Sequence, residues 1–191
     1  MTNTTNPNIH LMVDIETLGN QPNAPIFAIG AASFDITTGT IINSFYSLID
    51  FSYADNNPAF SFSASTIAWW CSQNEKATKE LVKATENGGK IQNVLLEFSN
   101  FVSESNTTKY WAKGQFDFPI LNYHLSVLTP NLKALDFRKW RDLRTTLDEA
   151  EINAKTYPKI GDAHNALNDC QFQIICLVDA WKRVTHWKGV S

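Results

Sequence analysis

The sequence predicts an α/β fold in which three antiparallel strands are followed by parallel strands, giving one mixed sheet with helices packed on it. Three observations predict this class. Strand-like segments come first and are separated by short turns, a long stretch with helical periodicity follows, and the second half alternates short strand-like segments with helices. Strands joined by turns pair antiparallel, whereas strands separated by helices pair parallel.

The first three strands are expected near residues 10–15, 25–35 and 40–50, where apolar and β-branched residues are concentrated. Thr37-Thr38-Gly39 separates the last two of these segments and is typical of a hairpin turn. The three segments therefore predict a β-meander.

Helical periodicity runs from residue 63 to residue 102, with apolar residues three or four positions apart. Asn87-Gly88-Gly89 predicts a break before the last of three helices. The apolar faces contain Ile67, Trp70 and Cys71, then Ala77, Leu81 and Val82, then Ile91, Val94, Leu95, Phe98 and Phe101.

The second half predicts alternating strands and helices. The expected elements are a strand at 110–112, a helix at 118–128, a short strand near 139–143, a helix around 145–150 and a final helix over 165–185. The segment 153–161 has no clear periodicity and leads to the final helix.

Length and composition predict one folded domain over residues 9–187, preceded by a flexible N-terminus over residues 1–8. The chain has 191 residues and is 43% hydrophobic, which suffices for one core. No run approaches the roughly 18 apolar residues of a membrane span, and the polar start does not resemble a signal peptide. We therefore expect a cytoplasmic protein with no membrane partner.

Three cysteines, Cys71, Cys170 and Cys176, have neither CxxC nor zinc-type spacing. We expect reduced, mostly buried thiols and no disulfide. His10, His124 and His186 also lack ligand-type spacing and are interpreted as packed or surface residues.

Two carboxylates, Asp14 and Glu16, stand where the first strand is expected to end. Alternate residues of a strand point to the same face, so both carboxylates share one side while Ile15 points to the core. Two close carboxylates disfavour each other's charge, and a divalent cation removes that cost. The alternative is a solvated strand end with incidental acidic residues.

Further candidates follow along the chain. Asp117 lies between a strand-like segment and a helix-like one, where an aspartate is also a typical N-cap. His164 and Asp169 precede and begin the final helical pattern. On a regular helix these two would lie about 140° apart, so His164 must reach a common site from a loop before the helix. A histidine on a loop near carboxylates is typical of a general base.

In this order and context, the residues resemble the DEDDh 3′-5′ exonucleases of the ribonuclease H-like superfamily, over nearly the whole chain. Trp69-Trp70 and the residues around Lys113-Gly114 are most similar to a branch of phage single-strand DNA exonucleases and small bacterial exoribonucleases. The tyrosine subfamily does not fit, because residue 165 is asparagine. The matching motifs are Asp14-x-Glu16-Thr17, Phe116-Asp117 and His164-x4-Asp169.

The resemblance implies two Mg²⁺ or Mn²⁺ ions per active site. Two cations about 3.5–4 Å apart stabilise both the entering and the leaving oxygen of a phosphodiester. By resemblance, Asp14 bridges both ions, Glu16 and Asp169 complete the site of one, Asp117 holds the other, and His164 deprotonates the attacking water.

The resemblance also implies contacts with the end of the substrate. Thr17 and Leu18 would contact the terminal sugar and wedge under the last base, and Phe118 either stacks on a base or packs in the core. Trp69 and Trp70 are adjacent, so one is expected to be buried and the other exposed.

The expected function is release of nucleoside monophosphates from the 3′ end of single-stranded nucleic acid, with DNA slightly favoured over RNA. An exoribonuclease is the alternative, since no residue pattern identifies a 2′-hydroxyl contact. A non-catalytic binding module of the same fold is more remote, because it needs no general base. The resemblance also allows a homodimer.

The net charge of −3 includes the four proposed ligand carboxylates, and the sequence has no long basic stripe. This favours binding of a single-stranded end through contacts with few phosphates over extended binding of a duplex. The candidates for backbone contacts are Lys113, Arg138, Lys139, Arg141 and Arg144.

Overall fold

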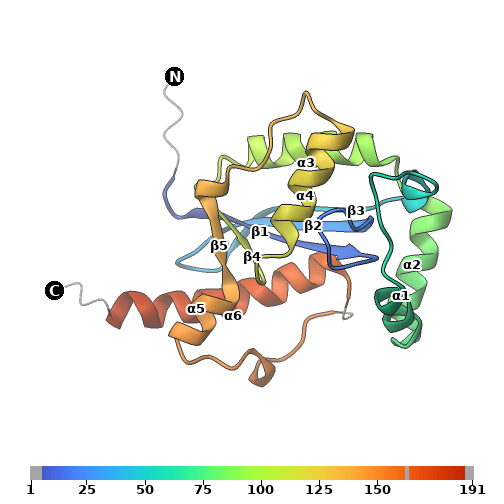
Figure 1. Ribbon diagram of the computed structural model, residues 1–191. Helices are drawn as coiled ribbons and strands as arrows, with labels where there is room; N and C mark the ends of the chain where they lie inside the picture. Colours follow the sequence, from blue (N-terminus) through green and yellow to red (C-terminus); the bar gives the residue numbers. More distant parts are fainter. Residues whose placement is uncertain (1–5, 162–163, 188–191) are drawn as a thin grey trace.

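Five strands form one mixed sheet in the order β3-β2-β1-β4-β5 (Figure 1) in the computed structural model, which describes residues 6–161 and 164–187. The first three strands pair antiparallel, whereas β4 pairs parallel with β1 and β5 pairs parallel with β4. The predicted fold class is therefore confirmed. The strands are β1 (Ile9–Thr17), β2 (Ile26–Asp35), β3 (Ile41–Leu48), β4 (Lys109–Ala112) and β5 (Trp140–Asp142).

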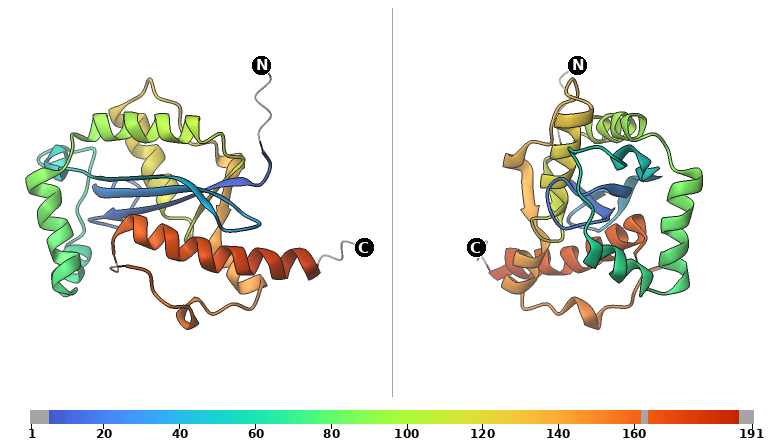
Figure 2. Two further views of the ribbon diagram at one scale, coloured as in Figure 1. Left: turned by 180° about the vertical axis from the view of Figure 1, so that it is seen from behind. Right: turned by 45° about the vertical axis from the view of Figure 1, so that its right-hand side comes forward.

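Helices cover both faces of the sheet and one of its ends. α3 and α4 lie on one face, α5 and α6 lie on the other, and α1 and α2 stand at the end near β3 (Figures 1 and 2). Three short 3₁₀ helices, which the sequence did not predict, lie in the connections. The helices are α1 (Ala64–Cys71), α2 (Glu75–Asn87), α3 (Ile91–Glu104), α4 (Asp117–Leu128), α5 (Leu143–Glu149) and α6 (Ala166–Trp187), and the 3₁₀ helices are Phe51–Ala54, Phe137–Lys139 and Ala154–Thr156.

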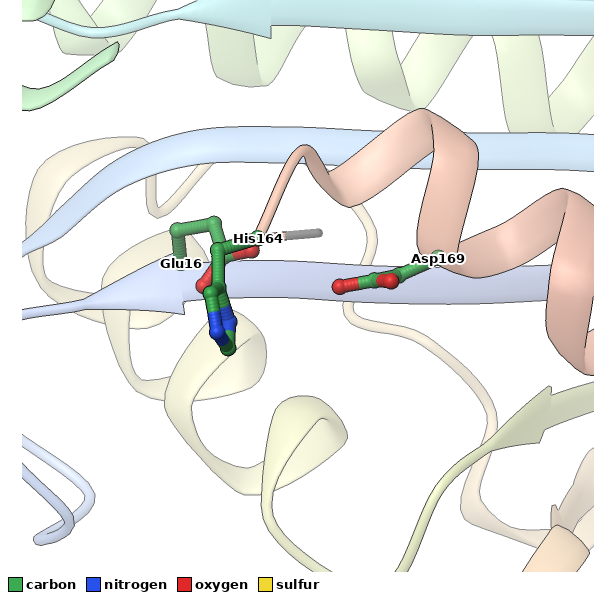
Figure 3. A group of neighbouring side chains, drawn as sticks. All are labelled: Glu16, His164 and Asp169. Carbon is green, nitrogen blue, oxygen red and sulfur yellow. The ribbon is translucent and has the colours of Figure 1, made fainter. Parts of the chain in front are cut away.

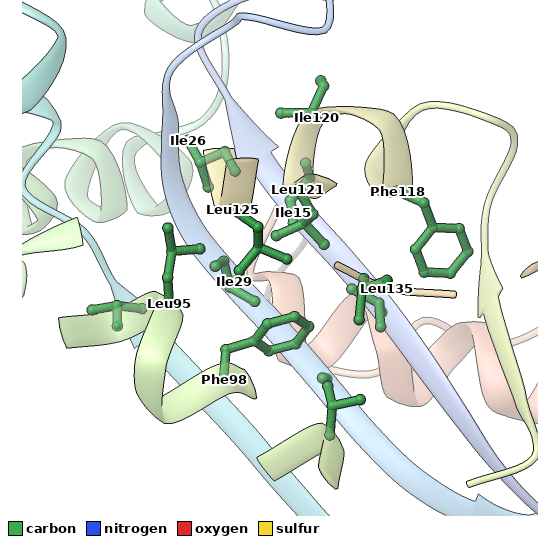
Figure 4. Close-up of a cluster of buried hydrophobic side chains, with 14 of the residues drawn as sticks. Ile15, Ile26, Ile29, Leu95, Phe98, Phe118, Ile120, Leu121, Leu125 and Leu135 are labelled. Carbon is green, nitrogen blue, oxygen red and sulfur yellow. The ribbon is translucent and has the colours of Figure 1, made fainter. Parts of the chain in front are cut away.

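The alternation of β1 separates the core from the side that carries the acidic residues. Leu11, Val13 and Ile15 belong to the core between the sheet and α3 and α4 (Figure 4). Met12 belongs to the second core, on the side of α6. Asp14 has the same parity as Met12, so its side chain lies on the α6 side.

β1 is longer than the strand predicted at residues 10–15. It continues to Thr17, and both acidic residues are still paired with β2, Asp14 opposite Gly30 and Glu16 opposite Ala28. The prediction stopped early because acidic residues disfavour strands, but pairing with a buried neighbour overrides that preference.

The structure tests the interpretation of the histidines that lie outside the proposed site. His10 and His124 are buried, as the packing interpretation requires, and each has a ring nitrogen hydrogen-bonded, to Trp111 and Tyr53 respectively. Burial lowers the pKa of both imidazoles to about 4. The side chain of His186 and most of the predicted flexible N-terminus, residues 1–5, lie outside the described residues.

The three cysteines are free thiols, with Cys170 and Cys176 buried and Cys71 exposed. Among the helices that the structure describes, none combines the length and the apolar character needed to cross a membrane.

Gly30 allows the start of α6 to lie directly on β2. A Cβ atom at this position would lie 2.3 Å from the carbonyl carbon of Ala166, a backbone atom that cannot move independently of its helix. Because Gly30 is the strand partner of Asp14, the same contact brings the start of α6 close to the acidic end of β1.

Gly30→Ala should therefore reduce the free energy of unfolding by about 2 kcal/mol or more, since either β2 or α6 must shift. Denaturant unfolding measures this change. Gly19→Ala is the matched control, because its nearest contacts are the movable end of Gln21, at 2.9 Å, and a methyl group. Equal losses in the two variants would contradict the close-approach argument.

Candidate active site

The fold brings the five predicted site residues to one edge of the sheet. β1 and β4 are parallel neighbours, so their carboxyl ends meet at the same edge. Asp14 and Glu16 lie at the end of β1, and Asp117 begins the helix that follows β4. His164 lies two residues before the start of α6, and Asp169 lies in the first turn of that helix.

Glu16, His164 and Asp169 form the tightest part of the group. One potential ligand atom from each residue lies within 4.8 Å of those of the other two. Figure 3 shows Glu16 projecting from β1, Asp169 from α6 and His164 from the loop before that helix. The predicted position of His164, before the helix rather than on it, is confirmed.

Asp117 is held by the main chain of β1. Its Oδ1 atom accepts a hydrogen bond of 3.1 Å from the backbone N–H of Ile15. The N-cap interpretation is corrected here, because Phe116 occupies the N-cap position and Asp117 is the first residue of α4. The carboxylate instead points back to the strand that carries Asp14 and Glu16.

The surroundings of the four carboxylates disfavour their charged forms. Burial is the largest cause, and it raises the pKa of Asp14 and Glu16 well above the ordinary values and raises that of Asp117 to about 7. The charges of Asp117 and Asp169 further raise the pKa of Asp14 and Glu16. Burial also raises the pKa of Asp169, although the neighbouring His164 opposes this.

A divalent cation fits this group on two observations. The donors are carboxylate oxygens, the ligands that Mg²⁺ and Mn²⁺ prefer. In addition, Oε1 of Glu16 is buried and has no hydrogen-bond partner among the described residues. A buried carboxylate oxygen without a donor is costly, and a bound cation removes that cost.

Two tryptophans contact the side chain of His164. Its ring meets those of Trp69 and Trp70 edge to face, at centroid distances of 5.0 and 5.7 Å. His164 adopts a left-handed backbone with φ of 65°, which an L residue keeps only when its surroundings hold it. The two aromatic contacts hold the imidazole near the carboxylates.

The prediction that one tryptophan is buried and the other exposed is confirmed. Trp70 is 2% exposed, and its Nε1–H donates to the carbonyl oxygen of Thr17 at 2.9 Å. Trp69 is 43% exposed. The buried ring fixes the end of β1, while the exposed ring faces solvent beside His164.

Two hollows adjoin the carboxylates. The larger, of about 420 Å³, is lined by Ile15, Glu16, Thr17, Asn20, Ser65, Thr66, Trp69, Trp70 and Phe116. The smaller, of about 260 Å³, is lined by Asp14, Lys113, Lys159, Ile160, His164, Asp169, Phe172 and Gln173. One hollow thus has aromatic walls and the other contains two lysines.

Of the three residues expected to contact the terminal nucleotide, Thr17 lines the larger hollow, whereas Leu18 and Phe118 line neither hollow beside the carboxylates. Leu18 is 3% exposed and packs with Phe27 and Trp70, so the structure gives it a packing role. Phe118 is 2% exposed and stacks on Trp140, with centroids 5.1 Å apart. For Phe118 the structure therefore supports the packing alternative over base stacking.

The predicted basic contacts separate into two groups. Lys113 lines the smaller hollow, and the charge of Arg144 acts on Asp117. Arg138, Lys139 and Arg141 instead bond to backbone carbonyls or pack on rings around β5. Only the first group lies near the carboxylates.

Sequence reasoning missed Gln173, whose Nε2–H donates to Oδ1 of Asp14 at 2.7 Å. A signal was available, because Gln173 follows Asp169 by four residues and so lies on the same helix face. The contact of the tryptophans with His164 had no such signal, since it joins segments far apart in sequence.

Comparisons with known proteins agree with this geometry. Residues 9–181 match the family described as the 3′-5′ exoribonuclease Rv2179c-like domain. An exodeoxyribonuclease of Enterobacteria phage T4 is 24% identical, and the match covers 87% of this chain and 86% of the relative.

Solved structures share the fold at low identity. The nuclease domain of 3′hExo, a DEDDh family member bound to rAMP, has a TM-score of 0.61 at 15% identity, covering 92% of both chains. Exonuclease I of E. coli in complex with a dA16 oligonucleotide has a TM-score of 0.65 at 12% identity. The match covers 94% of this chain but only 42% of exonuclease I.

The metal-free protein should lose stability as the pH rises from 6.5 to 8.5. The folded state holds protons that the unfolded state has already released, because the pKa of Asp117, about 7, and those of its neighbours are raised on folding. The expected loss is about 1 kcal/mol for each titrating carboxylate. Below this range, protonation of His10 and His124 acts in the opposite direction.

Thermal unfolding in EDTA across this pH range measures the effect, and adding Mn²⁺ should raise the Tm more at pH 8.5 than at pH 6.5. Asp14→Asn is the control, since it removes one charge at nearly constant shape and should weaken both responses. A Tm that is independent of pH and of Mn²⁺ would contradict a carboxylate site for a cation.

Proposed function

We propose a substrate and a set of reacting residues for this chain, which belongs to the family of Rv2179c-like 3′-5′ exoribonuclease domains and is a 3′-5′ exonuclease of the DEDDh type. The substrate is the 3′ end of a single-stranded nucleic acid, with DNA favoured over RNA. The products are nucleoside monophosphates.

One observation carries this proposal: a group of four carboxylates and a histidine adjoins a hollow with aromatic walls. Hydrolysis of a phosphodiester requires charge stabilisation and a base, which the group supplies. The hollow beside Glu16 and Thr17 has room for a terminal nucleoside, and Trp69 exposes a ring there on which a base can stack.

Asp14, Glu16, Asp117 and Asp169 are the residues that would hold two Mg²⁺ or Mn²⁺ ions. Such ions, when bound, stabilise the charge that develops on the phosphate and on the attacking and leaving oxygens. The hydrogen bond from the backbone N–H of Ile15 orients the carboxylate of Asp117.

His164 acts as the general base. Its imidazole lies beside Glu16 and Asp169 and is held by Trp69 and Trp70, so it can take the proton of a water in the site. The same geometry would also allow His164 to ligate a cation, but its loop position and left-handed backbone favour a residue outside the ligand set.

The preference for DNA rests on the T4 exodeoxyribonuclease, which matches this chain over most of both lengths. RNA is the second candidate, because the family is described as an exoribonuclease domain. The polar residues Asn20, Ser65 and Thr66 line the larger hollow and offer groups that could contact either sugar.

Digestion of matched 5′-labelled single-stranded DNA and RNA oligonucleotides tests the proposal. With Mg²⁺ or Mn²⁺ we expect a ladder that shortens from the 3′ end, faster on DNA. EDTA should abolish it, because the carboxylates then have no cation to hold. Asp14→Ala should reduce the rate by about 100-fold or more, since it removes a ligand of the site.

Lys155→Ala, at an exposed position away from both hollows, is the matched control and should digest as the wild type does. A faster ladder on RNA would replace DNA with the second candidate. Intact substrates under every metal would overturn the proposed substrate class.

His164→Ala should lower kcat by about 10³-fold, in line with the loss of a general base. Mn²⁺ binding, measured by electron paramagnetic resonance without nucleic acid, should change little. A parallel loss of Mn²⁺ affinity would instead identify His164 as a ligand.

A further inference from the structure

Gln173 lies opposite Asp14 because the spacings of a strand and a helix match at the site. Alternate residues of a strand are about 6.6 Å apart, and residues four apart on a helix are about 6 Å apart. Asp14 and Glu16 on β1 therefore face Gln173 and Asp169 on α6 as two pairs. Glu16 meets Asp169, and Asp14 meets Gln173.

The contact between Gln173 and Asp14 is short and shielded from solvent. Gln173 is 3% exposed, and its Nε2 atom lies 2.7 Å from Oδ1 of Asp14. Asp14 must be ionised to hold a cation, and an ionised carboxylate only accepts hydrogen bonds, so in that state the amide turns its NH₂ group to Asp14. This fixes the plane of the carboxylate and leaves its other oxygen for another partner.

The other end of the amide has no partner among the described residues. Oε1 of Gln173 is buried and accepts no hydrogen bond from any of them. A buried carbonyl oxygen without a donor is destabilising, so a residue kept only for packing would be better apolar. Gln173 also lines the smaller hollow, together with Lys113 and His164.

Other residue types would not serve as well at this position. A lysine would place a buried positive charge beside Asp14 and compete with a cation. A leucine or methionine would leave Oδ1 of Asp14 without its donor. A neutral donor orients the carboxylate and leaves its charge for the ion.

We infer that Gln173 is a positioning residue of the proposed metal site, which orients the carboxylate of Asp14 for the ion through its amide N–H. This inference rests on the proposed function, because it concerns the ions that such an enzyme requires. Partners that orient metal ligands commonly contribute 10- to 100-fold in metal affinity.

Gln173→Met tests the inference, because methionine has nearly the same length and lacks the amide. Mn²⁺ binding to the full chain, measured by electron paramagnetic resonance in the absence of nucleic acid, should weaken about tenfold. The Tm in EDTA should change little, since the loss of the donor to Asp14 and the removal of the unpartnered amide oxygen act in opposite directions. The concentration of Mn²⁺ for half-maximal digestion should rise, while kcat at saturating Mn²⁺ changes little.

Gln171→Met is the matched control, on the same helix but outside the residues that line either hollow, and should bind Mn²⁺ as the wild type does. Gln173→Asn keeps the amide but is too short to reach Asp14, so it should also weaken Mn²⁺ binding. If Gln173→Met fails to fold, the asparagine variant carries the test.

An unchanged Mn²⁺ affinity in the Gln173 variants, or no Mn²⁺ binding by the wild type, would overturn the inference. The binding measurement separates it from the proposed function. If the wild type digests neither DNA nor RNA but the Gln173 variants bind Mn²⁺ more weakly than it does, the inference is supported and the proposed function is contradicted. If the wild type digests its substrate but the Gln173 variants bind Mn²⁺ as it does, the proposed function is supported and the inference is contradicted.

Discussion

The burial of Asp14, Glu16, Asp117 and Asp169 close to one another is the constraint on which the rest of the site depends. Burial raises the pKa of each of the four, so the protein by itself disfavours the charged state that the chemistry of the site requires. Divalent cations, which the DEDDh family requires, stabilise the ionised carboxylates, and the same closely spaced charges bind such cations strongly. The site is thus unstable by itself and suited to its ions, as active sites with strongly perturbed pKa values commonly are.

The fold assembles this unfavourable group by making each acid part of an element that packs elsewhere. Asp14 and Glu16 alternate with Val13 and Ile15, whose side chains are buried in the core on the opposite face of the sheet. Asp117 begins α4, whose apolar residues pack in the same core. Burial of these apolar neighbours stabilises the backbone positions and offsets the cost of the carboxylates.

The position of His164 depends on a third element, α1. Trp69 and Trp70 come from α1, at the end of the sheet, and contact His164 just before α6. Both tryptophans also line the larger hollow, so the proposed nucleoside site and the proposed base share one wall. Binding at the hollow and placement of the imidazole are therefore linked through these two side chains.

The sequence by itself determined the order of the strands and helices, the fold class and the five candidate residues, because apolar periodicity and motif spacing are local properties of the chain. The shared face of Asp14 and Glu16 followed from the two-residue period of a strand, and the loop position of His164 from the period of a helix. Only the tertiary structure decided the full length of β1, the burial of Leu18 and Phe118, and the partners of the site residues. The hydrogen bonds from Gln173 to Asp14 and from Ile15 to Asp117, and the contacts of Trp69 and Trp70 with His164, join segments distant in sequence. They depend on how α6, α4 and α1 pack around the sheet, and no local pattern encodes that packing.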